Sequence, residues 1–134
     1  MLEKQCIQAR GFRNTFKDGE AVGFQMDVRS LYYRGLWLSQ IRSMTLSVDG
    51  VEYDAGKVRW RLAGVTYTMD EMARESGVHW GVTEPATLLV DKPGGLESGY
   101  HHVKFGFRFS SSYLPPFLDE VLSYPDHERD LILV

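Results

Sequence analysis

The fold of this chain is decided by the stretch Val103-Lys104-Phe105-Gly106-Phe107-Arg108-Phe109. Apolar side chains occupy every second position, and charged residues or glycine occupy the positions between them. Because successive side chains of a strand point to opposite faces of a sheet, this alternation predicts a strand whose aromatic residues share one face. No other part of the chain has so strong a period of two.

Weaker strand signals occur before and after this stretch. Met44, Leu46 and Val48 alternate with polar residues, and Asp49-Gly50 then supplies a tight turn. Ala63-Gly64 separates two further segments that are rich in β-branched and aromatic residues. We therefore expect strands over these additional ranges: 24–29, 44–48, 51–53, 58–62, 65–68, 86–90 and 131–134.

One segment has the pattern of a helix. Thr68 and Glu71 have the spacing of a capping box, Asp70 suits the first turn of a helix, and Gly77 is a stop signal. These residues predict a short helix over 69–75. Many short strands and one minor helix predict an all-β fold, an antiparallel β-sandwich, with a small barrel as the alternative architecture. The length of 134 residues predicts a single domain over 1–134.

The composition excludes several classes of protein. Hydrophobic residues make up 43% of the chain and charged residues 25%, which is typical of a globular domain. The net charge of −3 gives no reason to expect a nucleic-acid partner. No apolar run approaches the ~20 residues of a membrane helix. Cys6 is the single cysteine, so no intrachain disulfide is possible, and we expect a buried thiol in a cytoplasmic protein.

The histidines do not form a metal-binding pattern. His101 and His102 are adjacent, so on a strand they point to opposite faces and are poorly placed to bind one ion. Neither they nor His79 and His127 have a ligand spacing with a cysteine or a carboxylate. We therefore favour hydrogen-bonded or solvated histidines over metal ligands, and we predict no metal or cofactor in this chain.

No catalytic constellation is visible either. Asp70-Glu71 is explained by the start of the predicted helix, and Asp119-Glu120 and the Asp126/Glu128 pair have the pattern of solvated surface. Sequence adjacency does not place two carboxyl groups across a shared substrate, as acid–base catalysis requires. Ser110-Ser111-Ser112 lacks a nucleophile elbow. We predict no catalytic residue in this chain.

Aromatic residues are the remaining candidates for function. The segment Leu31–Leu38 carries apolar side chains at almost every position, which indicates more apolar surface than a single small sheet absorbs. For Tyr32, Tyr33 and Trp37 we favour an interface with a partner protein over a sugar-stacking platform. The segment Tyr113–Leu118 is a second candidate contact because its Pro-Pro pair cannot donate hydrogen bonds within a sheet.

Several phrases also occur in a familiar order: Gly23–Arg29, Tyr32–Gly35, Val48–Gly50, Tyr67–Met72, Lys92–Leu96 and Ser112–Pro115. Together they resemble the small β subunits of bacterial C-glycoside deglycosidases, over nearly the whole chain. The resemblance implies a compact β-sandwich that binds a larger, barrel-type α subunit and supports its active site. It also implies that the α subunit carries the acid–base residues and a divalent metal, Mn or Mg, and holds most of the substrate.

The chemistry implied by the resemblance is that of a carbon–carbon lyase. Its substrate is a C-glycoside whose sugar has been oxidised at position 3, and the bond to the aromatic aglycone breaks by elimination. No catalytic residue of that family transfers to this chain, so we expect the isolated chain to be inactive. The aglycone stays open among flavone, isoflavone, xanthone and anthraquinone types, and so does the number of αβ pairs.

The resemblance gives the apolar segment a purpose as an interface with the α subunit. We expect the following residues to form it: Tyr32, Tyr33, Arg34, Leu36, Trp37, Tyr113, Pro115 and Pro116. Two alternatives remain. One is a stand-alone carbohydrate-binding β-sandwich that uses the tryptophans and tyrosines, and the other is a small autonomous enzyme.

Overall fold

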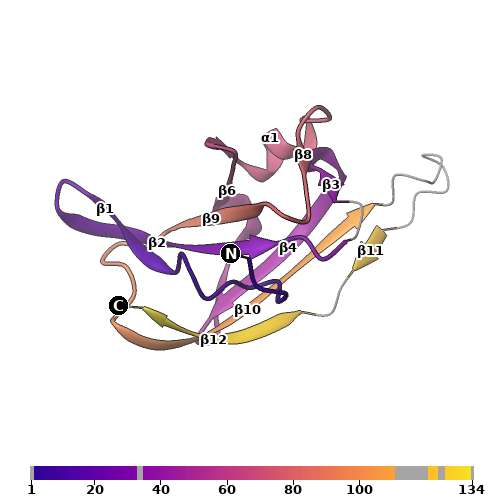
Figure 1. The fold of residues 1–134 in the computed structure, drawn as a ribbon. Coiled ribbons are helices and arrows are strands. Elements are labelled where there is room, and N and C mark those ends of the chain that lie inside the picture. Colours follow the sequence, from indigo (N-terminus) through magenta and orange to yellow (C-terminus); the bar gives the residue numbers. More distant parts are fainter. Residues whose placement is uncertain (1, 33–34, 111–120, 124–125, 134) are drawn as a thin grey trace.

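Two packed antiparallel sheets form the domain in the computed structural model, which describes residues 2–32, 35–110, 121–123 and 126–133 (Figure 1). The first sheet contains, in spatial order, β1 (Arg13–Lys17), β2 (Glu20–Arg29), β9 (Pro85–Asp91), β6 (Val58–Leu62) and β7 (Val65–Tyr67). In the second sheet, β10 (Gly99–Ser110) pairs with β4 (Ile41–Val48) along one edge and with β11 (Val121–Ser123) and β12 (His127–Leu133) along the other. Beyond β4 lies β5 (Val51–Tyr53).

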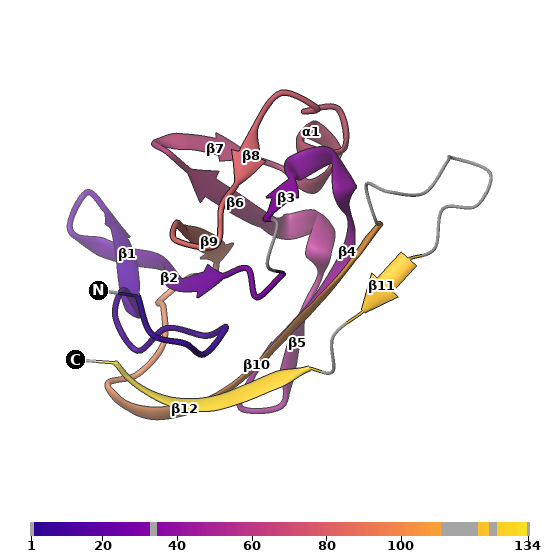
Figure 2. The same cartoon turned by 45° about the vertical axis from the view of Figure 1, so that its right-hand side comes forward.

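Smaller elements lie at one end of the two sheets. The strands β3 (Leu36–Trp37) and β8 (His79–Trp80) pair with each other, close to the helix α1 (Met69–Ala73) (Figure 2). Two single turns of 3-10 helix, η1 (Leu38–Gln40) and η2 (Ala55–Lys57), connect strands. Neither large sheet closes on itself within the described residues, so the sandwich prediction is confirmed and the barrel alternative is not. Among the described helices, none has the length and apolar character needed to cross a membrane.

The aromatic face of β10 forms the centre of the core, as its alternation predicts. Val103, Phe105, Phe107 and Phe109 are all at most 3% exposed. Trp60 of the opposite sheet packs against this face, with its ring centroid 6.0 Å from that of Phe105. Burial of such rings supplies much of the free energy that holds the two layers together.

The predicted turns between strands are also confirmed. Asp49 and Gly50 both have positive φ angles, 52° and 82°, where β4 turns into β5. Ala63 and Gly64 repeat the arrangement between β6 and β7, with φ angles of 51° and 83°. Two consecutive residues with positive φ match the right-handed twist of the flanking strands, which explains the glycine at the second position.

The predicted helix forms but is shorter than expected. The Thr68 side chain accepts the backbone N–H of Glu71 at 3.2 Å, and the Glu71 side chain accepts the N–H of Thr68 at 3.0 Å. This reciprocal pair is the predicted capping box. The helix ends at Ala73 rather than at Glu75, because Arg74 already forms the C-cap.

Some strands carry too little apolar signal to be predicted. β1 has no buried side chain, and β12 begins at His127, before the predicted start at Leu131. The first part of β12 is charged and half-exposed, so its pairing with β10 has no counterpart in the hydrophobic pattern. The sequence pattern does not predict β11 either.

Candidate functional site

Trp37 stands out at the corner formed by β3 and β8. Its side chain is 42% exposed, although the neighbouring Leu36 is fully buried. The indole ring meets the imidazole of His79 edge-on, with 5.0 Å between the ring centroids. Exposed tryptophans are enriched at protein interfaces because they offer a large contact area with few rotatable bonds.

The backbone around Trp37 is held in place on both sides. Strand pairing sets Leu36 opposite Trp80 and Trp37 opposite His79, so the first pair faces the core and the second faces solvent. The Gln40 side chain accepts the Trp37 N–H at 2.8 Å, and the backbone N–H of Leu38 donates to the Val78 carbonyl at 2.9 Å. Trp37 is therefore presented from a fixed strand, which lowers the entropic cost of binding a partner.

Of the other predicted interface residues, the two that the structure describes, Tyr32 and Leu36, do not join Trp37 at the surface. Tyr32 is 6% exposed and packs against Phe109 with 5.0 Å between ring centroids, and Leu36 is buried in the same core. The rest of the predicted set lies outside the described residues: Tyr33, Arg34, Tyr113, Pro115 and Pro116. Of the predicted set, Trp37 is the residue that is both described and exposed.

The described part of the segment Leu31–Leu38 thus buries more of its apolar surface than the composition suggests. It is not one continuous strand: the chain bends after β2, forms two residues of β3 and then enters η1. This irregular path sends Tyr32, Leu36 and Leu38 into the domain core. The expectation that a small sheet leaves this segment unburied is wrong for these three side chains.

The other two tryptophans belong to the core. Trp60 is 1% exposed and Trp80 is fully buried, and their ring centroids lie 5.6 Å apart. Trp60 therefore packs in the core between the two sheets. Because buried rings cannot stack on a sugar, the tryptophan platform of the carbohydrate-binding alternative loses two of its members.

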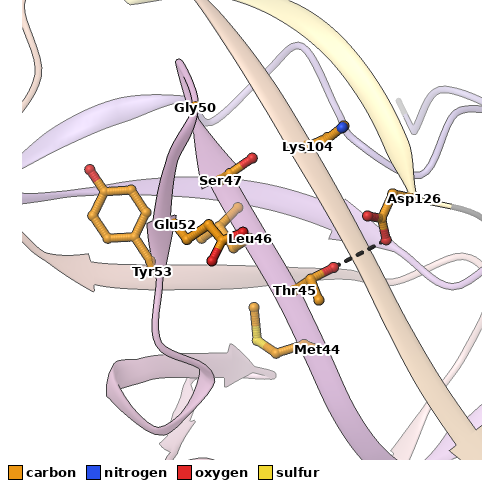
Figure 3. Close-up of a pocket in the computed structure, with 9 residues that line it drawn as sticks. All are labelled: Met44, Thr45, Leu46, Ser47, Gly50, Glu52, Tyr53, Lys104 and Asp126. Carbon is orange, nitrogen blue, oxygen red and sulfur yellow. Dashed lines mark hydrogen bonds between the residues drawn. The ribbon is translucent and has the colours of Figure 1, made fainter.

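A polar groove of about 460 Å³ crosses β5, β4 and β10 (Figure 3). Its lining includes Thr45 and Ser47 of β4, Glu52 of β5, Lys104 of β10 and Asp126. Sequence reasoning missed this groove, because it exists through strand register: Lys104 lies opposite Ser47. Thr45 donates to Asp126 at 3.1 Å, drawn as a dashed line in Figure 3. The lining of the groove therefore offers hydrogen-bond donors and acceptors.

The two adjacent histidines make hydrogen bonds, as predicted. His101 lies with Nδ1 2.6 Å from the Asp49 carboxylate and with Nε2 2.6 Å from the Glu97 carbonyl oxygen. His102 lies with Nδ1 2.7 Å from Asp130 and with Nε2 3.2 Å from Glu128. These partners are remote in sequence, so no spacing could have identified them.

The described residues do not fit a metal ion. Within the ranges that the structure describes, no group of three or more histidine, cysteine, aspartate or glutamate side chains is placed to hold one. Both ring nitrogens of His101 and of His102 already face acceptors of the protein. A divalent metal in the expected enzyme would therefore need ligands from elsewhere.

Cys6 is buried, and the described carboxylates Glu71 and Glu128 make contacts within the fold. Cys6 is 1% exposed, and burial raises the pKa of its thiol to about 12, so the predicted buried thiol is confirmed. Glu71 caps α1, while Glu128 contacts His102 and, at 3.5 Å, Lys104. Asp119-Glu120 lies outside the described residues.

Comparison with known proteins identifies relatives over most of the chain. A family model described as C-glycoside deglycosidase beta subunit matches residues 2–113. A C-glycoside deglycosidase beta subunit of Eubacterium cellulosolvens is 48% identical over 128 residues, which is 95% of this chain and 86% of that protein. One from Arthrobacter globiformis is 30% identical over 73% of this chain and 72% of its own length.

A further relative carries a more specific name. The 3'-dehydrocarminate deglycosidase beta subunit of a Microbacterium species is 29% identical over 69% of this chain and 70% of its own length. The resemblance noted in the sequence is confirmed by these matches. Together with the β-sandwich fold, they show that the chain belongs to the family of C-glycoside deglycosidase beta subunits.

Proposed function

We propose that this chain is the small subunit of a heteromeric C-deglycosylation enzyme, and that it binds and stabilises a larger catalytic α subunit of barrel type. The observation that carries the proposal is the family match over residues 2–113, supported by relatives that are named as beta subunits. The exposed and backbone-fixed Trp37 supports a binding role.

The proposed reaction is elimination from a 3-oxo-C-glycoside. The ketone at C3 acidifies the proton on C2 of the sugar, and a base of the α subunit removes it. The electron pair left on C2 forms the C1–C2 double bond as the bond from C1 to the aryl carbon breaks. That aryl carbon takes up a proton, which releases the aglycone. One relative's name specifies a 3'-dehydro substrate, which agrees with an oxidised sugar.

The proposal assigns the acid–base work and the divalent metal, Mn or Mg, to the α subunit. In the described part of this chain, several titratable side chains with shifted pKa values make contacts within the fold: Glu71 caps a helix, Asp49 contacts His101 and the backbone N–H of His102, and His102 contacts Asp130. A catalytic acid or base must instead reach the proton that it transfers. The small subunit would thus act by binding and support, in the cytoplasm, within a hetero-oligomer.

Co-expression with the large subunit tests the proposal. The two chains are purified together and separately, sized, and assayed on a 3-oxo-C-glucoside. We expect a stable complex with lyase activity and no turnover by this chain alone. Turnover by the isolated chain after addition of Mn²⁺ would contradict the proposal in favour of an autonomous enzyme. A monomer that does not bind the large subunit but binds sugars in a titration would favour the carbohydrate-binding alternative.

A further inference from the structure

His101 and His102 of β10 each face two hydrogen-bond acceptors, one at each ring nitrogen. The acceptors of His101 are the Asp49 carboxylate and the Glu97 carbonyl, both at 2.6 Å. Those of His102 are the carboxylates of Asp130, at 2.7 Å, and of Glu128, at 3.2 Å. A neutral imidazole has a single N–H and can donate to one acceptor only. All of these hydrogen bonds form together only when both rings carry an extra proton.

These hydrogen bonds connect β10 to segments that are distant in sequence. Asp49 belongs to the turn between β4 and β5, and Glu97 to the connection between β9 and β10. Glu128 and Asp130 belong to β12, which pairs with β10 along an edge of its sheet. Asp49 also accepts the backbone N–H of His102 at 2.8 Å, so one carboxylate contacts both histidines.

The charges around the two rings favour their protonated forms. Acidic groups face them from each packed segment: Asp49 from the β4–β5 turn, Glu97 beside β10, and Glu128 and Asp130 from β12. Tyr53 of β5 is the titratable neighbour of Asp49, and both burial and the Asp49 charge raise its pKa. Lys104 of β10 is the nearby cation, and it contacts Glu128.

The pKa values of both histidines move in the same direction. Burial lowers the pKa of His101, whose side chain is 10% exposed, but the hydrogen bonds to Glu97 and Asp49 outweigh it and raise the pKa overall. The hydrogen bonds to Asp130 and Glu128 raise the pKa of the half-exposed His102. These shifts agree with the geometry of the acceptors.

We propose that a histidine lock holds β12 and the β4–β5 turn against β10 while both rings are protonated, and loosens them when the rings lose their extra protons. Its members are His101, His102, Asp49, Glu97, Glu128 and Asp130. When a ring loses a proton, one of its two nitrogens becomes an acceptor and faces another acceptor. The sheet edge then loses hydrogen bonds, while the aromatic core between the two sheets is unaffected.

The direction of the pH effect follows from linkage. A histidine whose pKa is raised in the folded state contributes stability that is complete below the ordinary value of 6.5. That contribution is lost as the pH rises through the raised folded-state value. The histidine lock is therefore closed below about pH 6.5 and opens as the pH rises through the raised folded-state pKa values.

The first test measures the protonation of the rings directly. The full-length chain is labelled with ¹⁵N-histidine, and long-range ¹H–¹⁵N spectra are recorded from pH 5.5 to pH 9, with His102→Gln used for assignment. We expect His101 and His102 to lose their second ring proton at a midpoint above that of an ordinary imidazole, about 6.5. Midpoints at or below about 6.5 for both rings would overturn the proposal.

The second test measures whether deprotonation of the rings lowers the amide protection of β12. Amide hydrogen exchange is followed in β12 and in the central strand β9, and is corrected for the intrinsic pH dependence of exchange. We expect the protection of β12, relative to β9, to fall between pH 6.5 and pH 9. Asp130→Asn should lower the protection of β12 at pH 6.5 and flatten its pH profile.

Glu52→Gln provides the matched control. Glu52 lies in the same sheet but is not a hydrogen-bond partner of either histidine. Its variant should keep the wild-type profile. An unchanged profile in Asp130→Asn, or equal pH dependence in β12 and β9, would overturn the proposal. If Asp130→Asn fails to fold, the ring titration of the wild-type chain decides.

Discussion

Trp37 shows how the surroundings of a single side chain determine whether it is exposed. The imidazole of its strand partner His79 packs edge-on against the indole ring, and the Gln40 side chain accepts the backbone N–H of Trp37. Leu36, one residue earlier, points into the core and is fully buried. The alternation of a two-residue strand thus separates a core residue from a surface residue.

Replacement of Trp37 by alanine should weaken binding of the large subunit without unfolding the domain. Loss of a central tryptophan anchor costs ~2–4 kcal/mol of binding free energy, or roughly 30- to 1,000-fold in Kd. Co-purification and a titration of the two subunits measure the effect. Tyr100→Ala is the matched control, since Tyr100 is a 75% exposed aromatic residue on another strand. If Trp37→Ala binds as tightly as wild type, this corner is not the anchor.

Cys6 should be inert in the folded protein. Burial raises the pKa of its thiol to about 12, and the thiolate is the reactive form. We expect a thiol reagent such as Ellman's reagent to modify Cys6 at pH 8 only after denaturant unfolds the chain. Rapid modification of the native protein would show that the thiol is accessible.

At the scale of elements, local sequence signals and burial agree wherever an element has one apolar face. Phe24, Met26 and Val28 of β2, like the aromatic residues of β10, face inward as their alternation predicts. Elements with little apolar surface, such as β1 and the first half of β12, leave no such signal. β1 pairs through backbone hydrogen bonds with β2, the next strand in the chain, whereas β12 also makes charged contacts with β10, such as that of Glu128 with Lys104.

The capping box of α1 offers a test at this scale. Thr68→Ala removes the hydroxyl that accepts the Glu71 N–H, and loss of such a cap costs ~1 kcal/mol of stability. We expect the free energy of unfolding in urea to fall by that amount. Thr68→Ser keeps the hydroxyl and should retain most of the wild-type stability. Equal losses in the two variants would mean that the methyl group of Thr68, and not the cap, stabilises the helix.

At the scale of the whole molecule, several carboxylates couple stability to acidic pH. Hydrogen bonds formed in the folded state lower the pKa values of these carboxylates. Glu3 accepts from the Ala9 N–H and from Arg129, and Asp49 contacts His101 and the His102 N–H. Glu71 contacts Thr68, and Glu128 contacts His102. Groups with lowered pKa values stabilise the fold above their ordinary values of 3.8 and 4.5. That stabilisation is lost as the pH falls through the folded-state values.

The urea midpoint of unfolding should therefore decrease steadily below about pH 4.5. Asp49→Asn removes one of the responsible groups, so this variant should start from a lower midpoint and lose less on acidification. A wild-type midpoint that stays constant down to pH 3 would contradict the assignment of these hydrogen bonds.

The sequence by itself determined the fold class, most strand positions, the capped helix and the family, because each depends on neighbouring residues or on the order of short phrases. It could not determine which apolar side chains of Leu31–Leu38 reach the surface, and only the tertiary structure separated the exposed Trp37 from the buried Tyr32 and Leu36. It also could not predict the acceptors of His101 and His102. The physical reason is that strand register and chain bends bring distant residues within hydrogen-bond distance, and a local pattern contains no information about such long-range contacts.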